Sequence, residues 1–156
     1  MPAQETTPAY LKAFTILFFA LLLGQLLFAL IAFVLVFTGS FSGTDKETEK
    51  VFVYMVPLLQ ISLFIAAHTI FKKRIEPTKA GNNLPEKLAA YRALYILRFA
   101  LIEGATLFAI IAYLVTGVAL IGVFIAIGIL SFLTLKPSKE KLVKELELGT
   151  DEMEQI

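Results

Sequence analysis

One carboxylate stands in the middle of a long apolar stretch of this sequence. Glu103 lies near the centre of residues 94–115, which are long enough and apolar enough to cross a bilayer. A charge at that depth costs about 2.5–3.5 kcal/mol on insertion scales. We therefore expect Glu103 to be uncharged at pH 7, deeply buried among helices, and hydrogen-bonded to polar side chains of its neighbours.

Two glutamines stand at comparable depth in other apolar stretches. Gln25 lies near the middle of residues 11–37, and Gln60 lies near the middle of residues 51–71. A protonated carboxyl group can donate to a glutamine carbonyl and accept from a glutamine amide. Glu103, Gln25 and Gln60 therefore form a candidate proton- or ion-binding site. The alternative is that they only hold helices together, at about 0.6 kcal/mol per contact.

Residues 96–108 have the sequence Ile-Leu-Arg-Phe-Ala-Leu-Ile-Glu-Gly-Ala-Thr-Leu-Phe. This stretch resembles the ion-carrying helix of rotary ATP synthase c subunits, which has the form I-L-x-F-A-L-x-E-A-x-x-L-F. In that family the carboxylate binds the transported proton or sodium ion, so the resemblance implies that Glu103 binds an ion. It covers about 20 residues, the length of one membrane-spanning helix, and we recognise no family over the whole chain.

The other charged and polar side chains near this helix have simpler interpretations. Arg98 precedes Glu103 by five residues and lies on another face of the helix. We expect it to extend toward the membrane surface, the alternative being a pair with a group on another helix. His68 is expected to hydrogen-bond at the same boundary rather than to act as a pH switch. Tyr91 and Tyr95 are expected to anchor the helix at that interface.

Composition narrows the class of the protein. Of its 156 residues, 58% are hydrophobic, against about 45–50% in soluble domains. The net charge of +1 gives no basic surface for nucleic acid. There is no cysteine and only one histidine, which disfavours metal centres and haem, so no cofactor or metal is expected. Only Glu103 is a deep catalytic candidate, and catalysis needs at least two convergent groups, so we expect no enzyme.

Four apolar runs predict an all-α membrane protein with four transmembrane helices. The predicted spans are residues 11–37, 51–71, 94–115 and 118–135. Residues 1–137 then form the transmembrane domain, and residues 138–156 form a charged cytoplasmic tail with a short solvated helix.

The distribution of basic residues predicts the orientation. Lysine and arginine are frequent in residues 72–92 and in the tail, whereas residues 39–50 carry more acidic than basic groups. Positively charged loops stay in the cytoplasm. Both termini and the loop 72–92 are therefore expected on the cytoplasmic side of the cell (inner) membrane.

Residues 19–33 align without a gap over residues 99–113, and nine of the fifteen aligned pairs are identical. The match predicts two tandem helical hairpins, related as parallel repeats by an axis along the membrane normal. The alternative is coincidence between two helices rich in leucine, alanine and phenylalanine. Leu23 stands where the second copy has Glu103, so the charge is not part of the repeat.

Small residues four apart let membrane helices approach closely. The sequence holds three such pairs, and the first two are equivalent under the repeat. These predicted helix-packing residues are Ala20 and Gly24, Ala100 and Gly104, and Gly122 and Ala126.

Together these features predict a small non-enzymatic multi-pass membrane protein that acts through helix packing, as an accessory, assembly or scaffold subunit. Its expected partners are the lipid bilayer and either a second copy or another membrane protein. The alternative is a small proton- or ion-coupled transporter with Glu103 as the coupling site. The surroundings of Glu103 discriminate: a wet cavity favours transport, a pair with glutamine favours structural contact, and a carboxylate facing lipid indicates a missing partner.

Overall fold

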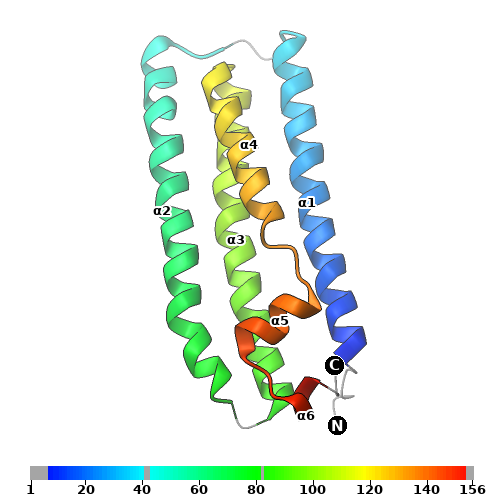
Figure 1. Ribbon diagram of the computed structural model, residues 1–156. Coiled ribbons are helices and arrows are strands. Elements are labelled where there is room, and N and C mark those ends of the chain that lie inside the picture. Colours follow the sequence, from blue (N-terminus) through cyan, green and yellow to red (C-terminus); the bar gives the residue numbers. More distant parts are fainter. Residues whose placement is uncertain (1–6, 41–42, 82, 154–156) are drawn as a thin grey trace.

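The computed structural model describes residues 7–40, 43–81 and 83–153, and these residues form helices and no strand. The side chains of residues 7–9 and 153 are outside this description. Figure 1 shows the helices, which are α1 (Thr7–Phe37), α2 (Lys46–Lys79), α3 (Leu84–Thr116), α4 (Ala119–Leu133), α5 (Lys139–Leu146) and α6 (Thr150–Met153).

Three of these helices are long and apolar enough to cross a membrane, namely α1, α2 and α3. The fourth apolar helix, α4, has 15 residues, which gives a length of about 22 Å against about 30 Å of hydrocarbon. The structure therefore confirms the all-α class and has the helices of a membrane protein. The helix α4 is shorter than the fourth predicted span, residues 118–135.

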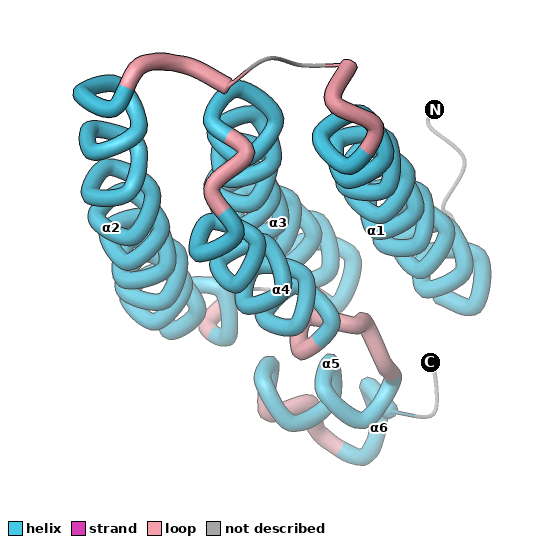
Figure 2. Tube along the Cα trace, turned by 90° about the horizontal axis from the view of Figure 1, so that it is seen from above, coloured by secondary structure: helices cyan, strands magenta, loops and turns pink. Residues whose placement is uncertain are grey.

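The helix α3 occupies the centre of the bundle. α1, α2 and α4 each pack against it, and α1 and α2 lie on opposite sides of it (Figure 2). The expected first hairpin is therefore not formed, because α3 separates the two helices that would compose it. The structure therefore does not confirm the tandem-hairpin arrangement.

Aromatic side chains explain why α1 packs on α3 rather than on α2. Phe14 and Phe18, one turn apart on α1, are buried. Phe14 stacks on Phe99 of α3 with ring centroids 5.5 Å apart. Phe18 stacks on Phe132 of α4 at 5.2 Å and lies 5.8 Å from Phe99. Large buried rings of this kind contribute the most area and about 0.5–1.5 kcal/mol per pair beyond it.

Local signals fix where the helices begin and end. The Asp45 carboxylate accepts hydrogen bonds from the backbone N–H groups of Glu47 and Thr48, both 3.0 Å long, and so caps α2. Asn83 caps α3 in the same way, through the N–H of Glu86 at 3.0 Å. Gly117 ends α3 in a left-handed conformation (φ 68°), which permits the tight turn into α4.

The residues after α4 fold back on the bundle. The short helix expected there is present as α5, and Ser138 caps it. It is packed rather than solvated, because Leu142, Leu146 and Leu148 are buried in the same core as the aromatic residues of α3. The apolar spacing of these leucines outweighs the charge of the surrounding residues, so the tail is part of the folded unit.

The start of α1, the α2–α3 connection and both small helices lie at one end of the bundle, and the α3–α4 turn lies at the other (Figure 1). This end, which we call the tail end, is the one predicted to face the cytoplasm. The orientation itself stays a prediction.

The helices α3 and α4 approach one another closely at Gly128. A Cβ atom at Gly128 would overlap Thr106 Oγ1 and would lie 3.0 Å from both Thr106 Cβ and Cγ2. Thr106 cannot move away easily, because it is fully buried and its hydroxyl donates to the Ile102 carbonyl at 2.9 Å. Only glycine fits at position 128 while the helices stay at this distance.

We expect Gly128→Ala to lower the free energy of unfolding by about 1–3 kcal/mol, the usual range for overpacking a filled core. Denaturation with increasing SDS in mild detergent micelles, followed by circular dichroism, measures the change. Gly104→Ala is the matched control, because no described atom lies within 4 Å of its added Cβ. Equal unfolding curves for both variants and the wild type would contradict the close α3–α4 approach.

Candidate functional site

One face of α3 is left uncovered by α1, α2 and α4. Its residues are three, four or seven positions apart, so they share one side of the helix, and all are exposed. We call this surface the open face of α3, and it consists of Ala93, Ile96, Leu97, Ala100, Gly104 and Ile111.

Glu103 lies at the border of the open face, beside Gly104. It is only partly buried, so the expectation of a deeply buried carboxylate is wrong. Within the described residues, no hydrogen bond or ion pair reaches its carboxylate. The reason is that the aromatic packing of α1 and α4 fixes the orientation of α3, and this orientation turns position 103 toward the edge of the covered surface.

The two glutamines are in the interior and do not meet Glu103. Gln25 is fully buried (0% exposed), and neither its amide oxygen nor its amide nitrogen has a partner among the described residues. Gln60 is 3% exposed, and its Nε2 donates to the Phe124 carbonyl of α4 at 3.0 Å. Its Oε1 has no described partner. The proposed three-residue network is therefore not formed within this chain.

The predicted small-residue pairs lie mostly outside the core. Ala20, Gly24, Ala100 and Gly104 are exposed, and no described atom lies within 4 Å of a Cβ built at either glycine. Within one copy of the chain they bring no helices together, so a role in close contacts stays a prediction for a second chain.

The two residues of the third pair, Gly122 and Ala126, differ in their surroundings. A Cβ at Gly122 would lie 3.5 Å from the Phe33 ring, whereas Ala126 is exposed. The tightest contact belongs to Gly128, which sequence reasoning missed. Its neighbours four residues away, Phe124 and Phe132, are large, so it has no small-residue partner that would give a signal.

A polar cluster at the tail end was also missed. The Glu145 carboxylate of α5 accepts a hydrogen bond from the hydroxyl of Tyr91 and another from that of Tyr95, both 2.8 Å long. Both tyrosines are buried, at 2% and 1% exposed, rather than being anchors at the membrane surface. Their spacing of four residues puts them on one face, but only the return of the tail brings Glu145 to them.

Arg98 belongs to the same region. Its guanidinium carbon lies 4.6 Å from the Phe71 ring centroid and 5.9 Å from that of Tyr95, so it contacts the faces of two rings. Its Nε atom is buried without a described hydrogen-bond partner. Arg98 therefore packs against aromatic rings rather than simply extending to the surface. His68 is exposed.

Lys141 of α5 closes the end of α4. Its Nζ donates to the carbonyl oxygens of Thr134 and Lys136, which follow the last turn of that helix. Burial lowers the pKa of the Lys141 ammonium group, Glu145 raises that pKa, and the nearby positive charge of Arg98 lowers it. The three charged side chains therefore interact within one cluster.

Two ion pairs attach the remaining tail to the bundle. Lys87 of α3 and Glu152 of α6 lie 2.8 Å apart, and the hydrogen bond from Lys87 holds the pKa of Glu152 below its usual value. Lys79 of α2 contacts Glu147 at 2.6 Å. Because these pairs are partly exposed, each contributes about 0–1 kcal/mol, and the buried leucines supply most of the attachment.

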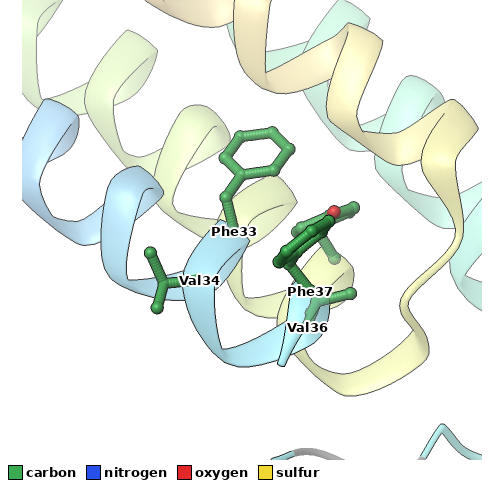
Figure 3. A pocket seen from close by; sticks show the side chains of 5 residues that line it. Phe33, Val34, Val36 and Phe37 are labelled. Atoms are coloured by element: carbon green, nitrogen blue, oxygen red, sulfur yellow. The ribbon is translucent and has the colours of Figure 1, made fainter. Parts of the chain in front are cut away.

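An open apolar depression of about 440 Å³ lies at the end of α1 remote from the tail (Figure 3). It is lined by Phe33, Val34, Val36, Phe37 and Tyr113. Four of these side chains have no polar atom, and the fifth carries the Tyr113 hydroxyl, so the depression mainly offers contact with apolar groups. Among the described residues, no group of three or more His, Asp or Glu side chains could hold a metal ion.

No protein family, no curated protein and no solved structure matches this chain. The resemblance of residues 96–108 to rotary c subunits therefore stays confined to that stretch, and the functional argument depends on the geometry described above.

The hydrogen bonds from Tyr91 and Tyr95 to Glu145 should hold α5 against α3. Glu145→Ala leaves two buried tyrosine hydroxyls without their acceptor, and hydrogen bonds to charged groups contribute about 1.5–3 kcal/mol. In a chain that also carries Leu142→Cys, we expect maleimide labelling of position 142 to become about tenfold faster or more. The natural chain has no cysteine, so the label reports one site.

Glu140→Ala is the matched control for this experiment, because Glu140 lies on the exposed side of α5. It should leave the labelling rate unchanged. If Glu145→Ala and Glu140→Ala label at the same rate, the tyrosine–carboxylate cluster does not hold α5 in place.

Proposed function

We propose that this protein is a small non-enzymatic multi-pass membrane protein that serves as an accessory, assembly or scaffold subunit. The open face of α3 is the surface by which it contacts its membrane partner. One observation carries the proposal: Glu103 borders an exposed apolar helix face and has no hydrogen-bond partner among the described residues of its own chain.

The energetic argument concerns an unsatisfied polar group in hydrocarbon. A carboxyl group that faces lipid without hydrogen bonds is costly, whether it is neutral or charged. A polar group on a second helix removes that cost, since a protonated carboxyl can both donate and accept. Because the isolated chain offers the Glu103 carboxyl group no described hydrogen-bond partner, binding of a second helix at this position is favoured.

The shape of the open face supports the same proposal. Ala93, Ala100 and Gly104 lie along it and allow the backbone of another helix to approach closely. Ile96, Leu97 and Ile111 flank these small residues on the open face. The helix α2 has no glycine, and its outer face exposes Leu58 and Ile61. A helix that docks on α3 meets both a polar group and a shallow surface.

The proposal includes a four-span architecture with both ends of the chain in the cytoplasm of the inner membrane. The basic residues Lys72, Lys73 and Arg74 are exposed near the tail end, as the positive-inside rule requires. In this proposal α4 and the residues that follow it together make the fourth crossing. The ends of α1, α2 and α3 alternate between the two ends of the bundle, and α4 runs back toward the tail end (Figure 1).

We also propose an internal duplication, which is limited to α1 and α3. The buried residues Phe14, Leu22, Gln25 and Ala29 of α1 align with Leu94, Ile102, Ala105 and Ala109 of α3, which are also buried. The same face of both helices is therefore turned inward, which supports a common origin for the two helices. Their partners α2 and α4 pack differently.

The second candidate is a small proton- or ion-coupled transporter with Glu103 as the coupling site. It is favoured by the partial exposure of Glu103 and by the resemblance of residues 96–108 to an ion-carrying helix. Gln25 and Gln60 do not hydrogen-bond to Glu103 in this chain. Transport would therefore require a second chain to supply the remaining ion ligands.

Substitutions of Glu103 distinguish the two candidates. If the carboxyl group binds a partner helix, Glu103→Leu should weaken co-purification of the partner, or self-association, by about tenfold, and Glu103→Gln should largely retain it. Chemical crosslinking in native membranes, followed by purification in mild detergent, measures this. Leu58→Ala on the outer face of α2 is the control and should have no effect.

If the protein is a transporter, the two Glu103 variants should behave differently from the partner-binding case. Both Glu103→Leu and Glu103→Gln should then assemble normally and lose proton-coupled flux in vesicles, since neither side chain exchanges a proton near neutral pH. Assembly that is unchanged by Glu103→Leu, together with unchanged flux, would contradict both candidates.

A further inference from the structure

Positively charged side chains come together at the tail end without enough negative charge to balance them. The guanidinium carbon of Arg98 lies 5.9 Å from the Tyr95 ring centroid, and the Tyr95 hydroxyl donates to Glu145 at 2.8 Å. Glu145 and Lys141 stand one turn apart on α5. Among the described interactions of these groups, two cations therefore face one anion. The imbalance is independent of Glu103 and the open face of α3.

The single carboxylate is already occupied. Glu145 accepts hydrogen bonds from the buried hydroxyls of Tyr91 and Tyr95, and none from Arg98 among the described contacts. Lys141 donates to the Thr134 and Lys136 carbonyls, which are neutral groups. The described contacts of the two cations are therefore with neutral carbonyl groups and aromatic rings, which do not neutralise the positive charge.

Arg98 has donors to spare. The rings of Phe71 and Tyr95 contact the guanidinium group through their faces, and ring faces leave the in-plane N–H groups of an arginine free for acceptors. Its Nε is buried and has no acceptor among the described residues. The two terminal nitrogens of Arg98 also have no described partner and are not fully buried, so they are the donors that an external acceptor can reach.

The cluster lies beside the end of α4 that is nearer the tail end of the bundle. Phe99, the residue after Arg98, contacts Phe132 near the end of α4 with ring centroids 5.3 Å apart. Arg98 is therefore level with the last turn of α4. The segment from Thr134 to Ser138 follows at once, and α5 lies below the end of α4, across the lower part of α3 (Figure 1). The short length of α4 brings the polar boundary up to Arg98.

We propose that Arg98 and Lys141 bind the phosphate group of an anionic phospholipid at the tail end of the bundle. The planar guanidinium group can bind two phosphate oxygens at once, and the Lys141 ammonium adds a point charge. Basic pockets between helices on the cytoplasmic side are known to take such headgroups. The lipid then connects α3 to α5 at the place where the tail folds onto the bundle.

Native mass spectrometry of the full chain in mild detergent tests the site, with phosphatidylglycerol and phosphatidylcholine added in parallel. The wild type should retain phosphatidylglycerol preferentially. Arg98→Gln and Lys141→Gln should each raise the apparent Kd for phosphatidylglycerol by about tenfold, as expected for loss of a charge-assisted hydrogen bond. Binding of phosphatidylcholine should not change.

Arg74→Gln is the matched control, because it removes one positive charge from an exposed position on α2 near the same end. It should leave the Kd unchanged. Lys141→Gln keeps the test valid if Arg98→Gln does not fold, since Lys141 lies at the surface end of the cluster. Circular dichroism of each variant identifies misfolded protein.

Three results would overturn the proposal. Equal retention of the two lipids by the wild type would exclude an anion site. Equal effects of Arg98→Gln, Lys141→Gln and Arg74→Gln would mean that only overall charge attracts the lipid. Displacement of phosphatidylglycerol by millimolar inorganic phosphate, with phosphate itself retained, would assign the site to free phosphate instead.

Discussion

The packing of three helices on α3 is the constraint on which the rest of this structure depends. Aromatic rings from α1 and α4 contact Phe99 of α3, and an aromatic ring from α2 contacts Tyr95, one turn away on the same helix. Large rings fix the rotation of α3 about its own axis, because they fit on one side only. Once that rotation is fixed, Glu103 and its small neighbours must lie at the uncovered side.

The same packing explains the charged tail. Tyr91 and Tyr95 are turned inward with the aromatic core, which would leave their hydroxyls buried without acceptors. The tail supplies the acceptor, Glu145, and buries Leu142 and Leu146 in the same step. A segment that the sequence predicts to be charged and solvated therefore completes the core, and it carries Lys141 to the neighbourhood of Arg98.

Much of the secondary structure was predictable from sequence, since apolar runs and capping residues such as Asn83 act locally. The sequence did not predict which side of each helix faces inward. Depth in the membrane places Gln25, Gln60 and Glu103 at one level, but rotation decides whether they meet, and rotation follows from distant aromatic contacts. For the same reason the Ala20 and Ala100 pairs are exposed. The contact between Glu145 and the tyrosines joins residues about fifty positions apart, for which a single sequence gives no signal.

The central claim is that the open face of α3 is covered by another chain in the membrane. A photo-crosslinking amino acid at position 104 in native membranes tests it most directly, with position 58 on the outer face of α2 as the reference, where Leu58 is 68% exposed. The account predicts a discrete protein–protein product from position 104 and only lipid adducts from position 58. Lipid adducts alone from position 104, or the same protein product from both positions, would contradict it.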